Sequence, residues 1–138
     1  MPPPSPARQP WWRRWFGTRS ERAAARYLRR QGMRILARNV TTPHGELDLV
    51  ALDAGCVVFV EVRSTGGDDT TRPAESVDAL KQRRLTEAAL DYLRRHRLLE
   101  YPARFDVLAL AWPAGQREPL VTHYRHAFEA VGRGQMYS

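Results

Sequence analysis

The chain has 138 residues, a length that fits one compact domain. Its 22 basic and 15 acidic residues give a formal charge of +7, which favours nucleic acid or an anionic membrane surface as partner, although simple solubility would also account for it. The single cysteine excludes a disulfide framework and indicates a cytoplasmic location, and the absence of a long apolar run excludes a transmembrane segment.

The first 17 residues, MPPPSPARQPWWRRWFG, are rich in proline, tryptophan and arginine. Proline forbids a helix at the start, so we expect a flexible arm over 1–17, a domain over 18–132 and a tail over 133–138. The tryptophans are expected to fold back onto the domain. The alternatives are stacking on bases or contact with a membrane interface.

Two helices and five strands are expected after the arm. The first helix covers 18–31, because Thr18 and Glu21 form a capping-box pattern and Gly32 follows as a stop. The remaining elements are strands over 34–40, 46–53 and 56–63, a helix over 78–96 with Ser76 as N-cap, and strands over 105–112 and 120–124, with turns over 41–45 and 113–119 and a polar loop over 64–73. This order predicts an α/β fold in which helices flank a mixed sheet.

The second helix has an apolar stripe at helical spacing. Its members are Val77, Leu80, Leu85, Ala88, Ala89, Tyr92 and Leu93. Lys81 extends this stripe towards the sheet and is expected to meet a phosphate or a carboxylate, or else to lie along the surface. Arg83 and Arg84 are expected to face phosphate or solvent.

Charged residues interrupt the two apolar strands over 46–53 and 56–63. If Ala54-Gly55 is a two-residue turn, Asp48 falls opposite Glu61. By the same register Glu46 falls opposite Arg63, and side-chain alternation puts all four charges on one face. A β-bulge would break this arrangement.

Two facing carboxylates repel each other, so this arrangement needs a compensating interaction. A shared proton, neutralising arginines or a divalent cation could each supply it. Oxygen ligands from Asp48 and Glu61, with positions left for water and phosphate, suit Mg²⁺ or Mn²⁺. Arg63 would then reach a scissile phosphate, as metal-aided phosphodiester hydrolysis requires. The alternative is a solvated strand face with ordinary ion pairs.

Several blocks of the sequence resemble a known family. The blocks are GELDLVA followed by VFVEVRS, together with SERAAARYLRRQGMRILARN, ESVDALKQRRLTEAALDYL, RFDVLAL and HAFEA. They resemble the YraN-like family of bacterial proteins, which looks like the PD-(D/E)xK nucleases near archaeal Holliday-junction resolvases. The resemblance implies a restriction-endonuclease-like α/β fold, with Asp48 and Glu61 as metal carboxylates and Arg63 in place of the superfamily's lysine.

The resemblance also bears on residues around this motif. Glu21 matches a position where related resolvases carry an additional acidic residue, although it is also suited to capping its helix. Arg63 cannot act as a base, because its guanidinium does not lose a proton, but it can orient water and stabilise charge. The family often has a further arginine where this chain has Thr65.

The remaining polar candidates have simple structural interpretations. His44 lies in a Pro-His-Gly turn beside the proposed site, and Cys56 is expected to be a buried structural thiol. Asp106 is expected to pair with Arg104 or a neighbouring strand. The histidines at 123 and 126 have too few partners to form a zinc site.

The sequence therefore predicts a cytoplasmic endonuclease that depends on Mg²⁺ or Mn²⁺ and acts on DNA, including branched or junction DNA, and a homodimer is compatible with this activity. Asp48, Glu61 and Arg63 are the predicted catalytic residues, with Glu21, Glu46 and Lys81 in support. Arg63, Lys81 and Arg84 are the predicted nucleic-acid contacts. One alternative is a catalytically weak or inactive nuclease-fold module that binds nucleic acid. The other is a membrane-associated accessory protein that uses the Trp/Arg arm.

Overall fold

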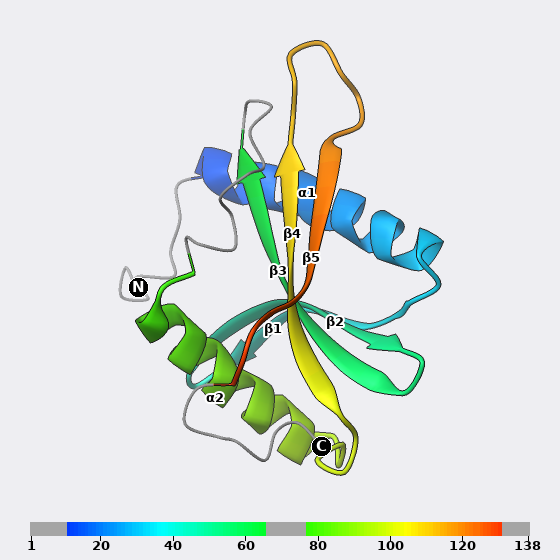
Figure 1. Ribbon diagram of the computed structural model, residues 1–138. Coiled ribbons are helices and arrows are strands. Elements are labelled where there is room, and N and C mark those ends of the chain that lie inside the picture. Colours follow the sequence, from blue (N-terminus) through cyan, green and yellow to red (C-terminus); the bar gives the residue numbers. More distant parts are fainter. Residues whose placement is uncertain (1–10, 66–76, 131–138) are drawn as a thin grey trace.

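The computed structural model describes residues 11–65 and 77–130, with the backbone alone for 11–18 and for residue 65 (Figure 1). The elements in chain order are α1 (Trp11–Arg30), β1 (Arg34–Thr42), β2 (Gly45–Asp53), β3 (Cys56–Thr65), α2 (Ala79–Arg95), β4 (Ala103–Ala111) and β5 (Leu120–Phe128). None of the helices in these ranges is long and apolar enough to cross a membrane.

The five strands form one mixed sheet in the order β1-β2-β3-β4-β5. Neighbouring strands are antiparallel except β3 and β4, which run parallel and are joined through α2. The predicted α/β class with a mixed sheet is confirmed. The parallel pair was not specified by the sequence pattern.

The helices cover opposite faces of the sheet, and the alternation along β3 determines which residues each helix meets. Val58 and Val60 pack in one cluster with Ala24 and Leu28 of α1. Phe59 lies between Val58 and Val60, so its side chain points to the other face of the sheet. There it packs in the other cluster with α2 residues Leu85, Ala88, Ala89, Tyr92 and Leu93. Each fully buried Leu or Phe side chain contributes about 1.5–3 kcal/mol, so both layers hold the sheet in place.

The helix starts differ from the sequence prediction. Helix α1 begins at Trp11, so Thr18 lies within it and the predicted N-cap at Thr18 is wrong. Helix α2 is capped by Asp78, whose Oδ1 accepts a hydrogen bond from the Lys81 N–H at 2.8 Å. The predicted cap Ser76 lies outside the described residues. Leu80 is 57% exposed, so its placement in the buried stripe was also wrong.

The strands are longer than predicted, but the central hairpin turn is as expected. Strand β1 continues to Thr42 and β5 to Phe128, and the turn between β1 and β2 narrows to two residues. Ala54 and Gly55 form the β2–β3 turn with φ values of 50° and 86°, the left-handed pair that a type I′ turn requires. This tight turn fixes the register of the hairpin that carries the candidate site.

Candidate functional site

The β2–β3 register confirms the predicted hairpin as far as the site and then changes. Pairing runs from Asp53 opposite Cys56 to Leu49 opposite Val60. At the next position the Val62 N–H donates to Asp48 Oδ2 at 2.9 Å. The Asp48 side chain therefore occupies the place where strand pairing would have continued.

Asp48 and Glu61 nevertheless meet on one side of the sheet. Glu61 continues the alternation of Phe59 and faces α2. The two acids line the same small pocket, whose other lining residues are Leu47, Phe59, Val60, Leu85, Phe105, Asp106 and Phe128. Glu61 is only 8% exposed, so this carboxylate is largely withdrawn from water.

Two cationic side chains converge on Glu61. Lys81 Nζ, from the first turn of α2, lies 3.0 Å from Glu61 Oε2. Arg63 Nε lies 3.5 Å from the same oxygen, and among the residues that the structure describes this buried nitrogen has no hydrogen-bond partner. Glu46 is exposed and is not paired with Arg63, because pairing between β2 and β3 ends at Leu49 and Val60; its charge acts on Glu21 instead. The predicted pairing of Glu46 with Arg63 is therefore wrong.

The carboxylate of Asp48 has a strongly altered acidity. Burial and the neighbouring charge of Glu61 raise the pKa of Asp48 to about 8, against the opposing effects of the Val62 hydrogen bond and Lys81. Asp48 therefore holds a proton to a large extent at neutral pH. A proton on Asp48 and the Lys81 ammonium beside Glu61 together offset the repulsion expected for this pair.

Glu21 and Asn39 extend the site on the side of α1 and β1. Burial raises the pKa of Glu21, whereas a hydrogen bond from Asn39 lowers it, and Glu21 in turn acts electrostatically on Asp48. Asn39 falls between β1 residues paired with 49 and 47 of β2, and so stands opposite Asp48. Its φ of 51° is left-handed, a conformation that Asn tolerates better than most residues. Asn39 was not among the residues predicted from the sequence, although an Asn inside a predicted strand was an available signal.

The donor set fits an open site for Mg²⁺ or Mn²⁺. Both ions prefer oxygen ligands, and Mg²⁺ is often held by one or two carboxylates while water and phosphate complete its coordination. Asp48 and Glu61 supply such ligands. No group of three or more His, Cys, Asp and Glu side chains within residues 11–65 and 77–130 is placed to hold a metal ion. Any ion bound by Asp48 and Glu61 would therefore need further ligands from water or a substrate, which a closed structural site does not.

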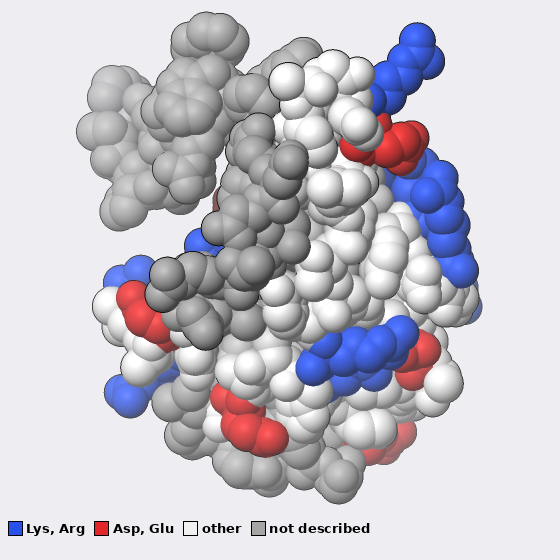
Figure 2. All heavy atoms as spheres, turned by 45° about the horizontal axis from the view of Figure 1, so that its top comes forward, with Lys and Arg blue, Asp and Glu red and all other residues white. Residues whose placement is uncertain are grey.

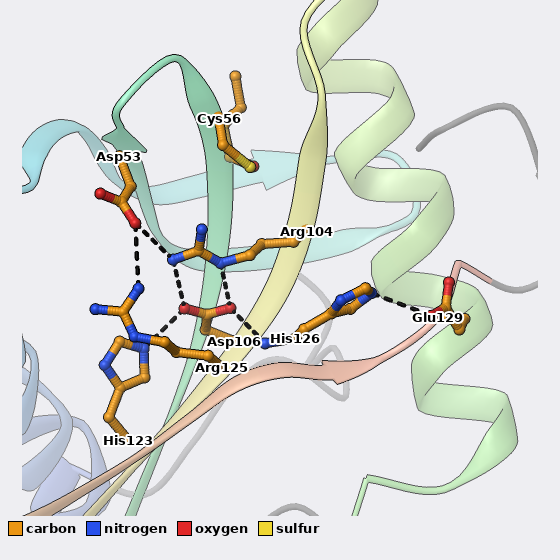
Figure 3. Close-up of polar contacts among 9 residues, drawn as sticks. Asp53, Cys56, Arg104, Asp106, His123, Arg125, His126 and Glu129 are labelled. Carbon is orange, nitrogen blue, oxygen red and sulfur yellow. Dashed lines mark hydrogen bonds and ion pairs between the residues drawn. The ribbon is translucent and has the colours of Figure 1, made fainter. Parts of the chain in front are cut away.

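A second polar cluster surrounds the fully buried Asp106 (Figure 3). Arg104 donates to both of its oxygens, at 3.0 and 3.2 Å, which confirms the predicted pairing. His123 Nε2 lies 2.7 Å from Oδ2, and the His126 N–H donates to Oδ1 at 2.9 Å. Arg104 also binds Asp53 at 2.9 Å. The cluster therefore ties the β2–β3 turn to β4 and β5 and stabilises the sheet.

The other singled-out residues have local structural roles. Thr42 Oγ1 accepts from the His44 N–H at 3.0 Å and donates to Gly45 O at 2.7 Å, so these contacts close the β1–β2 turn. Cys56 is half-buried, and burial raises the pKa of its thiol, which keeps the unreactive protonated form. Arg84 lies exposed on α2.

Exposed arginines also follow one side of α1. They are Arg22, Arg26, Arg29 and Arg30, opposite the buried alanines of the same helix. Figure 2 shows Lys and Arg side chains gathered along one side of the molecule, with more scattered charges elsewhere on that face. Such a concentration of positive charge provides an attractive field for phosphates.

Comparison with known proteins identifies the family. The model of the family described as "Uncharacterised protein family UPF0102" matches residues 20–110. A UPF0102 protein of Rhodopirellula baltica is 44% identical over 125 residues, which cover 88% of this chain and 75% of the relative. Relatives from Syntrophotalea carbinolica and Anaeromyxobacter dehalogenans are 45% and 44% identical, covering 85% and 88% of this chain and 94% and 89% of their own lengths. These matches confirm the YraN-like resemblance, and the chain belongs to the UPF0102 family.

Proposed function

We propose that this protein is a metal-dependent endonuclease with a restriction-endonuclease-like fold, acting on DNA in the cytoplasm. The observation that carries the proposal is the convergence of Asp48 and Glu61, two acids in one pocket, with the cations Lys81 and Arg63 at hand. Two carboxylates beside two cations are the groups that phosphodiester hydrolysis needs. The mixed sheet with one helix on each face is compatible with this fold.

In this proposal some side chains of the site bind the metal ion and others stabilise charge on the substrate. A bound Mg²⁺ or Mn²⁺ would activate water and neutralise charge on a phosphate oxygen. Asp48 and Glu61 would hold the ion, and Asp48 would give up its proton on binding. The permanently charged guanidinium of Arg63, whose Nε lies 3.5 Å from Glu61 Oε2, would bind the phosphate as negative charge develops. Glu21, positioned by Asn39, would add negative potential beside Asp48.

The surface charge supports nucleic acid as the substrate. Exposed arginines on α1, together with Arg84 on α2, would bind backbone phosphates without reading sequence. Branched or junction DNA remains the preferred substrate class from the resemblance.

A binding module without activity is the second candidate. The observation that favours it is Arg63, which cannot take a proton from water where related nucleases carry lysine. In that case the carboxylate pair would serve as an ion-pair element, held by Lys81.

Cleavage assays separate these functions. Purified protein would be incubated with Mg²⁺ or Mn²⁺ and linear, flapped or four-way-junction DNA, beside Asp48→Ala and Arg63→Lys. Metal-dependent cleavage that Asp48→Ala abolishes and Arg63→Lys keeps or improves supports the nuclease. DNA binding without cleavage by any variant supports the binding module. No binding and no cleavage would reject nucleic acid as the partner.

A further inference from the structure

Lys81 is the only lysine in the chain, and its ammonium forms an ion pair with Glu61. Nζ is 3.0 Å from Oε2 of the nearly buried Glu61, while the lysine side chain itself is 45% exposed. Lys81 stands in the first turn of α2, close after its cap Asp78, so the helix start fixes where the side chain begins. The nearly buried carboxylate of Glu61 is therefore paired with a side chain that solvent can reach.

This one ammonium affects both acids. Besides its ion pair with Glu61, Lys81 acts electrostatically on Asp48, where it opposes the effect of burial on the carboxyl group. A divalent cation held by Asp48 and Glu61 would need the same oxygens, and two cations at one carboxylate repel each other. The long, partly exposed lysine stem can rotate outwards, whereas Arg63 has its Nε buried.

We propose that Lys81 is the internal counter-ion of the metal-free site and that a divalent cation displaces its ammonium, which then becomes free to contact a substrate phosphate. The inference rests on the proposed function, because it requires a metal at Asp48 and Glu61. It adds an exchange of cations to that function. In the metal-free protein the Lys81 ammonium of α2 offsets the repulsion between Asp48 and Glu61, and the bound metal ion then replaces it.

The test compares Lys81→Met, which keeps the length of the side chain and removes its charge, with Arg94→Met. Arg94 is exposed in the last turn of α2, about 20 Å along the helix from Lys81, and serves as the charge-matched control. Mg²⁺ affinity would be measured by titration calorimetry at a pH above the pKa of Asp48, where proton competition is reduced, and metal-free melting temperature alongside. Lys81→Met should bind Mg²⁺ about threefold or more tightly than wild type and melt lower without metal. Arg94→Met should change neither value.

The outcomes separate the inference from the function beneath it. If wild type binds Mg²⁺ and Lys81→Met binds it equally well or more weakly, the counter-ion role of Lys81 is overturned. The proposed metal site is unaffected by that result. An equal gain in Arg94→Met overturns it too, because the effect would then be one of net charge. If Lys81→Met binds Mg²⁺ and wild type does not, the counter-ion role is supported, since the lysine of wild type would then block the site. No Mg²⁺ binding by wild type or either variant rejects the metal site and the counter-ion together.

Discussion

The Val62 N–H donates a hydrogen bond to Asp48 Oδ2 at 2.9 Å, and this side chain takes the place of a backbone partner. Pairing between β2 and β3 stops at Leu49 and Val60, while β3 continues beside β4 as far as Thr65. The two strands thus separate where the acids lie. Asp48 is held by a backbone donor, which limits the positions its carboxylate can adopt.

Asp48→Asn is expected to raise the melting temperature of the metal-free protein by a few degrees near pH 8. The pKa of Asp48 is about 8 in the folded protein, against an ordinary value of 3.8, and burial is the main cause. The unfolded chain loses this proton first, so the stability contributed by the group falls as pH rises from about 4 to about 8. Asn keeps an acceptor for the Val62 N–H and does not ionise.

Melting curves at a series of pH values across this window would check the prediction. Asp48→Asn should reduce the fall in melting temperature as pH rises, whereas Glu100→Gln, at an exposed position, should show the same fall as wild type. Mg²⁺ should stabilise wild type and not Asp48→Asn. Parallel pH profiles for wild type and Asp48→Asn would contradict the raised pKa.

At Asn39, a Gly substitution should leave the protein more stable than an Ala substitution, which is the reverse of the usual order. Its φ of 51° is unfavourable for Ala, so Asn39→Ala should be less stable than Asn39→Gly by about 0.5–1 kcal/mol, measured by urea unfolding. Both variants lose the hydrogen bond to Glu21. At neighbouring Arg38, which has no positive φ, Gly should be the more harmful residue. The same order at both positions would argue against a left-handed Asn39.

Ala54→Asn should stabilise the protein by about 0.5–1 kcal/mol. Ala54 occupies the first left-handed position of the β2–β3 turn, where Asn is strongly preferred before Gly. Gly55→Ala should destabilise, because Gly55 has a φ of 86°. Ala114→Asn, in the exposed β4–β5 connection, is the control and should have little effect in thermal melts. A destabilised Ala54→Asn would show that another feature sets this turn.

Asp106→Asn should cost about 3 kcal/mol or more in urea unfolding, because it removes the charge that Arg104 faces in the buried cluster. Burial alone would raise the pKa of Asp106, but hydrogen bonds from His123, Arg104 and the His126 N–H hold it below its ordinary value. The stability from this group is therefore present above about pH 4 and lost as pH falls through the folded pKa. Glu118→Gln, at an exposed acid, should leave acid unfolding unchanged, and a similar loss in both variants would contradict the specific role of the cluster.

DNA binding should weaken steeply as salt rises, because released counter-ions supply most of the affinity. Replacing Arg22 and Arg29 of α1 with Gln should reduce the slope of log affinity against log salt by about 0.9 for each phosphate that the protein no longer neutralises. Arg117→Gln, on the β4–β5 connection, provides the comparison. Fluorescence anisotropy with labelled duplex measures the slope, and a salt-insensitive affinity would count against binding through phosphates.

Local patterns predicted most elements and the hairpin that carries the acids. The turn at Ala54-Gly55 fixes the register, so index arithmetic alone put Asp48 and Glu61 together. Contacts between residues far apart in the chain could not be predicted from local patterns. The hydrogen bond that the Val62 N–H donates to the Asp48 side chain lies where pairing between β2 and β3 ends, so Glu46 is not paired with β3 and is not opposite Arg63.

The helix boundaries and Asn39 illustrate two further limits. Thr18 and Glu21 satisfy a capping pattern, yet α1 already begins at Trp11, since capping signals do not prevent a helix from starting earlier. Asn39 acts through a left-handed backbone inside a strand, and alternation of polar and apolar residues carries no information on φ. Lys81 was placed towards the sheet correctly, but only the packing of α2 identified Glu61 as its partner.

The order of strands in the sheet repeats their order in the chain, and this has a consequence for folding kinetics. The β1–β2–β3 meander closes through short turns, whereas β4 joins only after the crossover through α2. Local contacts form early, so Asp48 and Glu61 should meet in the transition state before α2 brings Lys81. The repulsion between the acids would then slow the folding limb of a chevron plot, and neutralising Asp48 should speed folding more than it slows unfolding.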